Sequence, residues 1–372
     1  MGNVPHLRFP EFSGEWVTKS INDLAVVIGG GTPDTTVKSY WDGEIQWFTP
    51  SEIGKNKYVD SSLRTITEVG LNNSSAKLLP PNTILLSSRA TIGECSLSLR
   101  ECATNQGFQC LVSKKCNVDF LYYLIQTKKK DLIRKSCGST FLEISANEVR
   151  KIQVSVPSDV EQQKIAELLS LIDERIATQN KIIEDLKILK SAIAERLFNS
   201  TDGDILSLSD VCIIQKGKQV NGEDLSETGK FYVMNGGVEP SGYYDQCNTP
   251  ANTISISEGG NSCGYIQYNR DAFWSGGHCY TLNNIQPNVC KLYLYHYLKS
   301  QESSIMKLRI GTGLPNIQKK DLEKFHILLT SKAIQESISA FLTTIDRKIT
   351  NEDMLLQRFQ KGKQYLLRQM FI

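Results

Sequence analysis

The sequence lacks the segments that carry proteins into or across membranes. No run approaches the roughly 18 consecutive apolar residues that a membrane-spanning helix needs. The first residues, Met1–His6, have neither the basic nor the apolar region of a signal peptide. We therefore expect a cytoplasmic protein with no membrane partner.

Patterns that bind metal ions are also missing. The histidines at 6, 278, 296 and 326 include no HxxxH pair, and no two of the ten cysteines form a CxxC motif. Zinc sites usually draw their ligands from such closely spaced pairs. We therefore expect no metal site in this chain, and cysteines that remain reduced thiols.

Motifs of DNA-modifying enzymes are absent as well. There is no NPPY- or DPPY-like tetrapeptide of an amino-methyltransferase, since Pro80-Pro81-Asn82 has the wrong order. There is no GxxxxGK[ST] loop for a nucleotide and no histidine-rich nuclease cluster. The sequence predicts a protein that binds and does not catalyse. A self-contained nuclease or methyltransferase is the enzyme alternative, which DNA modification by the purified chain alone would support.

Strong net charge is the last absence. The 372 residues carry a formal net charge of +2, with 40% hydrophobic and 22% charged residues. This composition predicts buried cores in two or three domains. A free-standing binder of duplex DNA is usually strongly basic. A DNA-binding function would therefore need locally concentrated DNA contacts, or partner proteins that supply part of the contact with DNA.

An internal repeat is the strongest pattern that is present. A shift of 173 residues aligns Val118–Phe198 with Lys291–Phe371 without a gap. Upstream the match is weaker, with Thr83–Ser87 resembling Thr253–Ser257. Each half is therefore a variable globular part followed by a better-kept tail. The predicted divisions are 1–156, 157–202, 203–329 and 330–372.

The two tails are predicted to be long helices. Apolar residues recur in steps of three and four, as in the seam of a coiled coil. The seam positions are Ile165, Leu169, Ile172, Ile176, Ile183, Leu186, Ile193 and Leu197 in the first tail, and Ile338, Leu342, Ile345, Ile349, Leu356, Phe359, Leu366 and Met370 in the second. Both seams are interrupted at matching places, by Gln179 and Lys190 and by Glu352 and Lys363. A capping box, Ser158–Glu161, is expected to begin the first helix.

The charges of the tails favour pairing within the chain. Residues 157–202 carry a net charge of −3 and residues 330–372 a net charge of +3. Opposite charges favour an antiparallel coiled coil of the two tails, although each exposed ion pair contributes little. At about 1.5 Å per residue, a rod of about 40 helical residues would span roughly 60 Å. The alternative is that each helix lies on its own domain.

The globular parts are predicted to be α+β. Short β-type runs, such as Ala25–Ile28, Thr83–Leu86 and Thr253–Ile256, alternate with turns rich in Gly, Asn and Ser. One helix is expected in each part, at 118–135 and at 291–308. The predicted fold is two pseudo-repeated mixed α/β domains separated by two long antiparallel coiled-coil helices.

Polar side chains crowd the predicted turns. Arg, Lys, Asn and Gln can read base edges in the major groove. Any single Gly-rich turn, including Gly29–Gly31, fits a plain β-turn better than a DNA-contacting loop, and Lys128–Lys130 fits a solvated helix face better than a phosphate clamp. The candidate DNA-contacting residues are Thr32, Lys55, Lys57, Ser88, Arg89, Asn105, Gln106, Lys216, Lys218, Asn235, Asn261 and His278.

Several segments resemble the specificity (S) subunit family of type I restriction-modification enzymes. They are Leu7–Trp16, Leu85–Gly93, Ala103–Phe108, Glu161–Ala166 and Met234–Tyr243. The resemblance covers nearly the whole chain and keeps the family's order of recognition domain, conserved helix, recognition domain and conserved helix. It implies a non-catalytic subunit of a type I site-specific deoxyribonuclease and adenine methyltransferase complex.

The resemblance also implies how the parts divide the work. Each globular part would be a target recognition domain that reads one half of a bipartite target in double-stranded DNA. The paired helices would set the gap and dock two methyltransferase (M) subunits, which restriction (R) subunits would join. S-adenosylmethionine, Mg²⁺ and ATP would belong to these partners, with no cofactor in this chain.

One departure from the family pattern concerns the start of the second helix. Glu161-Gln162-Gln163 is only partly kept there, as Ile334-Gln335-Glu336, so its docking surface is expected to differ. The alternative function is a coiled-coil scaffold without DNA binding that holds two protein-binding domains apart. Failure of the M-containing complex to prefer any DNA sequence would support the scaffold.

The repeat predicts that the two domains are independent modules. Replacing residues 1–156 with another recognition domain should change one half of the DNA target and leave the other half and the gap unchanged. Sequencing of methylated sites in cells that carry the chimera and the M subunit measures this. A chimera that changed both halves would contradict the modular interpretation.

Overall fold

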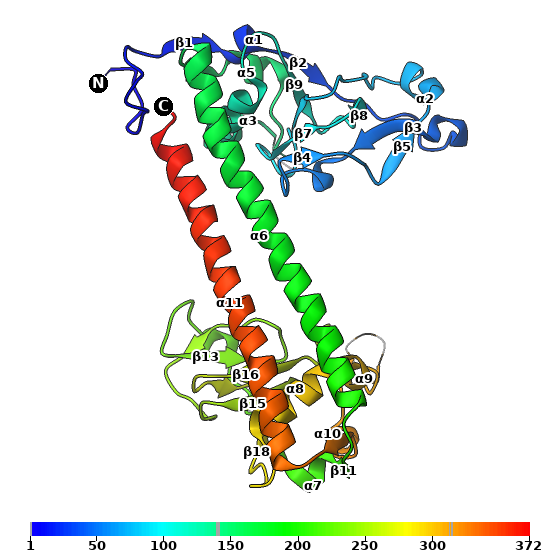
Figure 1. The fold of residues 1–372 in the computed structure, drawn as a ribbon. Coiled ribbons are helices and arrows are strands. Elements are labelled where there is room, and N and C mark those ends of the chain that lie inside the picture. The colour runs from blue at the N-terminus through cyan, green and yellow to red at the C-terminus, as the bar shows by residue number, and fades with distance from the viewer. Residues whose placement is uncertain (1, 139–141, 312, 314) are drawn as a thin grey trace. The chain divides into compact units, whose positions relative to one another are not determined.

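The computed structural model describes residues 2–138, 142–311, 313 and 315–372, which form two compact units (Figure 1). Unit 1 comprises Met1–Asn180 and Leu355–Ile372, and unit 2 comprises Lys181–Met354. Helices α6 (Asp159–Asn199) and α11 (Lys332–Gln369) each contribute to both units. The unit boundaries fall inside these helices, and the predicted divisions 1–156, 157–202, 203–329 and 330–372 stay a prediction. In the described part of the chain, no helix is long and apolar enough to cross a membrane.

Unit 1 is built around a five-stranded sheet. The described strands of its globular part are β1 Val17–Ser20, β2 Ala25–Gly29, β3 Trp41–Phe48, β4 Tyr58–Val59, β5 Arg64–Ile66, β6 Ile84–Leu86, β7 Cys95–Ser98, β8 Cys102–Thr104, β9 Gln109–Ser113 and β10 Gln153–Val156. The five-stranded sheet has the order β2-β9-β6-β7-β4, and a smaller sheet has the order β5-β3-β8. Strand β1 pairs with β10, which directly precedes α6.

Unit 2 repeats this plan with one strand fewer. Its described strands are β11 Asp204–Ser207, β12 Ile213–Lys216, β13 Phe231–Met234, β14 Tyr243–Tyr244, β15 Thr253–Ser257, β16 Ile266–Asn269, β17 Trp274–Ser275, β18 Cys279–Asn283 and β19 His326–Leu329. The order β12-β18-β15-β16 corresponds to β2-β9-β6-β7, and β14-β13-β17 corresponds to β5-β3-β8. In both small sheets the central strand has one antiparallel and one parallel neighbour.

This correspondence confirms the predicted fold class. Two mixed α/β domains repeat one topology, α6 lies between them in the sequence, and α11 follows the second. The β-type runs predicted at Ala25–Ile28, Thr83–Leu86 and Thr253–Ile256 form strands β2, β6 and β15. Their β-branched residues favour strands. Turns rich in Gly, Asn and Ser lie between them along the chain.

The single helices predicted at 118–135 and 291–308 are each two helices. The first is divided into α3 (Val118–Thr127) and α4 (Lys129–Arg134), and the second into α8 (Lys291–Ser300) and α9 (Glu302–Met306). At both breaks, Lys128 and Gln301, the backbone leaves the helical region, with ψ of 8° and 10°. The other short helices are α1 Ile21–Leu24, α2 Glu68–Asn72, α5 Ala146–Lys151, α7 Leu208–Val211 and α10 Lys319–Glu323.

A buried glutamine joins the long helix of each repeat to its domain. Gln162 Oε1 accepts from the backbone N–H of Asn117 (3.0 Å), and Gln335 Oε1 accepts from that of Cys290 (2.8 Å). Their Nε2 atoms donate to the carbonyls of Pro157 (3.0 Å) and Thr330 (2.7 Å). An unpaired buried backbone group costs about 1–3 kcal/mol. The two glutamines therefore provide equivalent hydrogen-bond partners for backbone N–H groups at the N-terminal ends of α3 and α8.

Only half of the predicted capping box at Ser158 forms. The Ser158 hydroxyl accepts from the N–H of Glu161 (3.4 Å). The Glu161 carboxylate instead accepts two hydrogen bonds from Arg8 (2.8 Å each) and one from Trp16 Nε1 (3.3 Å). A bidentate partner from the N-terminal segment is stronger than a bond to a single backbone N–H. Tertiary contact therefore replaces the local cap.

The long helices lie antiparallel in each unit (Figure 1). In unit 1, Lys363 Nζ is 2.6 Å from Asp173 Oδ1, and in unit 2, Lys190 Nζ is 2.5 Å from Asp346 Oδ1. As residue numbers rise along α6, those of the partners on α11 fall. The two ion pairs are equivalent under the shift of 173 residues, so the lysines that interrupt the predicted seam pair across it.

The predicted seam lies on the inner side of this helix pair. All sixteen predicted seam residues are buried or half-buried. The beginning of α6 also packs on its own domain, because Ile165 and Leu169 belong to the core of unit 1. Both the coiled-coil interpretation and its alternative therefore describe part of each helix.

An aromatic residue at the end of each long helix completes a domain core. In unit 1, Phe371 stacks on Phe120 with ring centroids 5.3 Å apart. In unit 2, Phe198 meets Tyr293 edge to face at 5.6 Å. Burial of such a side chain contributes about 1.5–3 kcal/mol, with a smaller addition from ring geometry. These contacts anchor the helix ends.

We predict that His296 makes stability depend on pH. Its ring is buried, Nε2 lies 3.0 Å from Thr343 Oγ1, and Nδ1 has no hydrogen-bond partner among the described residues. Burial, helped by nearby Lys190, lowers the pKa of His296 to about 4. The unfolded chain therefore binds the proton more readily, and stability is lost as pH falls from about 6.5 towards 4.

Unfolding by urea at pH 7 and pH 5 measures this effect. The wild type should lose about 2 kcal/mol of unfolding free energy through His296 over this interval. His296→Gln should lack that component, whereas His326→Gln, at an exposed position, should keep the wild-type pH dependence. Equal pH dependence in wild type and His296→Gln would show that His296 is not its origin.

Candidate nucleic-acid interface

Polar residues of unit 1 gather at one edge of the five-stranded sheet. Strand β2 ends and β9 begins there, and β6 ends beside them, because β9 is antiparallel to both neighbours. The predicted residues Thr32, Ser88, Arg89, Asn105 and Gln106 follow or precede these strand ends. The N–H of Gly31 donates to the Thr104 carbonyl (2.8 Å), and that of Ser88 to the Gly107 carbonyl (2.8 Å). Thr32 Oγ1 also donates to Gln106 Oε1.

The glycine run before Thr32 serves close backbone approach. A Cβ atom on Gly30 would stand 2.0 Å from the Asn105 carbonyl oxygen, and one on Gly31 would stand 2.3 Å from the Ala76 nitrogen. Side chains are therefore excluded at both positions. Gly30 packs against the backbone of Asn105, and Gly31 packs against that of Ala76. This close packing places Thr32 beside Gln106.

Arg89 is the exposed cation of this edge, and its neighbour Ser88 faces the interior. Arg89 Nη2 lies 2.7 Å from Glu143 Oε2, with 43% of its side chain exposed. Ser88 is fully buried, and its hydroxyl has no hydrogen-bond partner in the described structure. As placed, Ser88 cannot touch a base. Ala90, directly after Arg89, takes a left-handed φ of 56°.

Lys55 and Lys57 lie away from this edge. Lys57 Nζ is 2.6 Å from Asp119 Oδ1, donates to Ser170 Oγ (2.7 Å) and is only 7% exposed at its side chain. Lys55 lines a groove with Tyr122, Asp173 and Lys363. The structure therefore separates both lysines from Thr32, Arg89, Asn105 and Gln106. The ammonium group of Lys57 is already paired and desolvated, which removes it from the candidate DNA surface.

Unit 2 presents the corresponding edge. Strand β12 ends at Lys216, β15 ends at Ser257 and β18 begins at Cys279, with β18 antiparallel to both neighbours. Asn235 Oδ1 accepts from the N–H of His278 (3.0 Å). Lys218 donates through its backbone N–H to the Ser275 carbonyl (2.9 Å) and is exposed, as is Asn261. Four loops thus bring the five predicted residues of this domain together.

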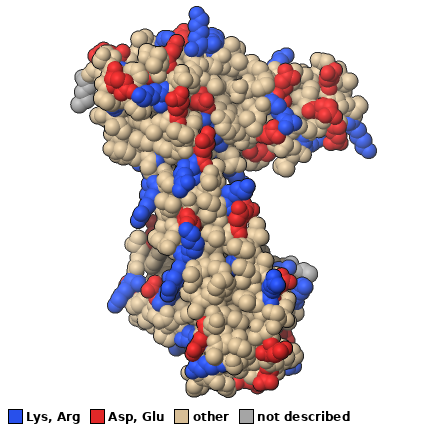
Figure 2. Space-filling model, in the orientation of Figure 1, with Lys and Arg blue, Asp and Glu red and all other residues tan. Residues whose placement is uncertain are grey.

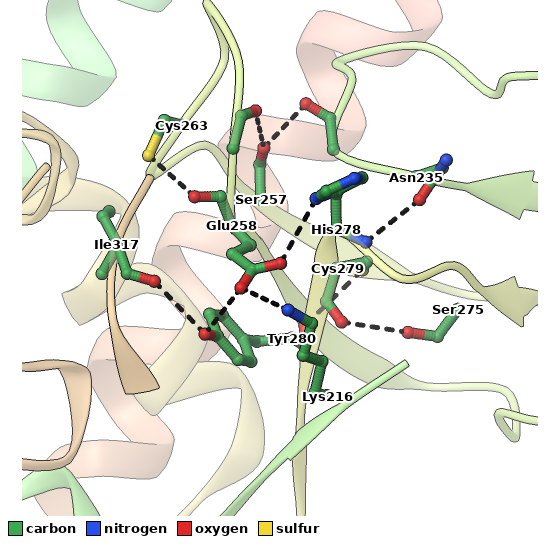
Figure 3. A network of polar contacts seen from close by, with 12 residues as sticks. Lys216, Asn235, Ser257, Glu258, Cys263, Ser275, His278, Cys279, Tyr280 and Ile317 are labelled. Carbon is green, nitrogen blue, oxygen red and sulfur yellow. Dashed lines mark hydrogen bonds and ion pairs between the residues drawn. The ribbon is translucent and has the colours of Figure 1, made fainter. Parts of the chain in front are cut away.

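Glu258 lies at the centre of these loops (Figure 3). Its Oε1 accepts from Lys216 Nζ (2.6 Å) and lies 3.1 Å from the Tyr280 hydroxyl, and His278 Nδ1 lies 3.4 Å from Oε2. Its backbone N–H donates to the His278 carbonyl (2.9 Å). Burial, with the Glu258 charge nearby, raises the pKa of Tyr280, which keeps its proton.

Glu143 and Glu258 stand outside the predicted set of residues. Both are acidic, and base readers are expected to be basic or amide side chains. Glu258 begins the Gly-rich turn Glu258–Asn261. Its place in the same turn as Asn261 was the sequence signal that could have indicated Glu258 as a site residue. Its link to Lys216, 42 residues away, depends on the pairing of β12, β18 and β15.

The chemistry of both edges suits contact with nucleic acid. Exposed Arg89, Lys216 and Lys218 can bind phosphates or guanine, and Asn and Gln side chains can pair with adenine. On the face drawn in Figure 2, acidic and basic side chains are mixed, without a field of one sign. Within the described ranges, no three His, Cys, Asp or Glu side chains lie close enough to hold a metal ion.

Known proteins similar to this chain share one description. The family "type I restriction modification DNA specificity domain" matches residues 13–187 and 202–358. The type I restriction enzyme MjaIX specificity subunit of Methanocaldococcus jannaschii is 27% identical, over 95% of this chain and 92% of its own. The EcoR124I/EcoR124II specificity subunit of Escherichia coli is 31% identical, over 48% of this chain and 45% of its own.

Two solved structures have a similar fold. The S subunit of a type I restriction-modification system from M. genitalium has a TM-score of 0.65 at 20% identity, and the match covers 99% of both chains. A chain from a solved structure on complex assembly in the type I R-M system has a TM-score of 0.60 at 16% identity, over 96% of this chain and 97% of its own. The repeated architecture is therefore shared along the whole length.

Neighbouring Arg89 and Ser88 provide a matched pair of variants. Arg89→Ala should weaken binding of a DNA target by about 1–3 kcal/mol and relax specificity at one position if Arg89 reads a base. Ser88→Ala removes a buried hydroxyl and should leave DNA affinity unchanged. Dissociation constants of the chain with its partner subunits measure both. Equal effects of the two changes would place the contact elsewhere.

Proposed function

This chain belongs to the type I restriction-modification specificity family, and on that premise we propose that it selects the DNA sequence on which such a complex acts. It is a specificity subunit with two DNA specificity domains, at residues 13–187 and 202–358. Each domain reads one half of a bipartite target in double-stranded DNA. The observation that carries this proposal is the repeated edge, in which equivalent strand ends present polar loops in both units.

The small size of each edge supports recognition by two half-sites. Each edge offers only a few loop side chains, such as Thr32, Arg89, Asn105 and Gln106 in unit 1, which is enough to read a short stretch of bases. Loops on a rigid sheet can vary without disturbing the core. The differing loops of the two domains therefore favour two different half-site sequences.

We further propose that the helix pair docks two methyltransferase (M) subunits. Helices α6 and α11 run from one unit into the other and carry equivalent ion pairs, Lys363 with Asp173 and Lys190 with Asp346. A pair of helices with this internal symmetry offers two related surfaces, which suits two M subunits. R subunits join this complex for cleavage. The catalysis, together with S-adenosylmethionine, Mg²⁺ and ATP, belongs to the partners, which makes this chain a non-catalytic subunit.

The two proposed docking surfaces differ at the start of the helices, where Glu161-Gln162-Gln163 aligns with Ile334-Gln335-Glu336. The repeat aligns Glu161 with Ile334. Glu161 is 1% exposed and bound by Arg8, whereas Ile334 is 43% exposed. The adjacent Gln162 and Gln335 keep the same buried contacts. The departure from the family pattern therefore changes the outer surface and leaves the internal joint intact.

The function is tested by mapping methylated positions in DNA from cells that contain this chain and its M subunit. The expected result is one bipartite sequence with a fixed gap. Methylation without sequence preference would instead favour the alternative, a coiled-coil scaffold that holds two protein-binding domains apart.

We predict that the helix pair sets the gap between the half-sites. Four residues inserted after Gln179 in α6 and four after Glu352 in α11 would keep both ion pairs, because these pairs lie on either side of the insertions. Each helix would lengthen by about 6 Å, at 1.5 Å per residue, with the seam close to its original phase. Methylation mapping should then show unchanged half-sites and a gap longer by about one or two base pairs, at 3.4 Å per step.

A one-residue insertion at the same two points is the control. It rotates the seam by about 100° and should impair folding or M docking. An unchanged gap after the four-residue insertions would mean that the helices are not the spacer.

A further inference from the structure

We propose that Glu258 is a positioning residue that holds Lys216 and His278 for readout of one half-site. The inference rests on the proposed function, since it concerns how domain 2 recognises its half of the target. Lys216 and His278 stand on different segments, at the end of β12 and before β18. The Glu258 carboxylate lies between them (Figure 3) and connects the two segments through one side chain.

The fold alone does not explain a carboxylate at this place. The Glu258 side chain is 12% exposed, and among the described atoms its Oε2 makes no hydrogen bond, with His278 Nδ1 in ion-pair range at 3.4 Å. The Tyr280 hydroxyl has one proton for two acceptors, Glu258 Oε1 at 3.1 Å and the Ile317 carbonyl at 3.2 Å. Burial of a charge with incomplete hydrogen bonding is unfavourable. We therefore assign this carboxylate a role in placing its cationic neighbours, Lys216 and His278.

The carboxylate orients Lys216 without using up its protons. Lys216 Nζ donates to Oε1 at 2.6 Å, while 51% of the side chain remains exposed. An ammonium group has three protons, so two remain for a phosphate or for guanine O6 and N7. The ion pair holds a flexible side chain in one direction before DNA arrives, which lowers the entropy lost on binding.

The carboxylate also orients the ring of His278. The Asn235 amide oxygen holds the backbone N–H of His278, and Nδ1 lies 3.4 Å from Glu258 Oε2. The proposed arrangement has a proton on Nδ1, since two acceptors would repel each other. The Nε2 atom, at the outer end of a side chain that is 62% exposed, is then the atom available to a base. In the neutral ring Nε2 accepts, which suits the amino group of adenine or cytosine.

This arrangement occurs in one domain only among the described residues. The repeat that aligns Thr83–Ser87 with Thr253–Ser257 places Ser88 where unit 2 has Glu258. Ser88 is buried and carries no charge, and the ion pair of the unit 1 edge joins Arg89 to Glu143. Loss of the Glu258 charge should therefore affect only the half-site that domain 2 reads.

Glu258→Gln tests the proposal because it keeps the shape and removes the charge. The complex with M subunits is titrated with three duplexes: the mapped target, the target with the domain 2 half-site scrambled, and DNA with both halves scrambled. Binding to the target should weaken about tenfold. Binding to fully scrambled DNA should strengthen, because a negative charge near the phosphates is gone. Local damage to the fold would weaken both, and a charge effect alone would strengthen both, so either result overturns the proposal.

Variants of Lys216 and His278 test the proposal even if Glu258→Gln fails to fold. Lys216→Met and His278→Gln change exposed side chains, and each should lower the preference for the correct domain 2 half-site. In the double variant Lys216→Met/His278→Gln, adding Glu258→Gln should cause no further loss. Retained half-site preference in both single variants overturns the proposal.

Two controls separate this inference from the proposed function. Glu323→Gln removes a carboxylate that pairs with Lys319 on helix α10, and it should leave all three affinities unchanged. Wild-type protein that binds the three duplexes equally would refute the proposed function itself. Wild-type preference for the target with an unaltered preference in Glu258→Gln would refute only the role of Glu258.

Discussion

The antiparallel pairing of α6 with α11 is the constraint on which both domain cores depend. Each long helix begins against the domain that precedes it in the sequence and ends in the core of the other unit. Phe371 packs with Phe120 in unit 1, and Phe198 packs with Tyr293 in unit 2. Neither half of the repeat therefore contains all the residues that close its own core, and each domain relies on the helix end supplied by the other half.

Ion pairs between α6 and α11 explain why the helices tolerate polar residues inside the seam. Lys190 and Lys363 are largely covered, yet each is neutralised by an aspartate from the opposite helix. Because a half-buried charge without its partner would be costly, the two pairs favour one register over its neighbours. A repeated pair sets the same register in both units, so the aromatic residues at the two helix ends reach their cores together.

Structural and recognition residues occupy different parts of each domain. The side of the sheet that packs on the helices is apolar, and buried Gln162 and Gln335 complete the joint there. The strand ends carry the polar loops. Since backbone hydrogen bonds such as those of Gly31 and Ser88 hold these loops, their exposed side chains can change with little effect on the core. Glu258 is the exception, because a largely buried residue there connects two loops.

The amino-acid sequence by itself determined the repeat, the long helices and the α+β class. Apolar spacing and the 173-residue shift are local or periodic patterns, and the structure confirms the fold class. The positions of Thr32, Asn105, Gln106, Asn235 and His278 near strand ends could be predicted because turns rich in Gly and Asn interrupt β-type runs. Their contact with DNA stays a prediction.

Only the tertiary structure decided which side chains meet. The burial of Ser88, the pairing of Lys57 with Asp119 and the position of Glu258 depend on strands and helices far apart in the sequence. The capture of Glu161 by Arg8 has the same origin. Periodicity indicates which face of an element is buried, but the partner across that face is selected by packing energies summed over the whole domain.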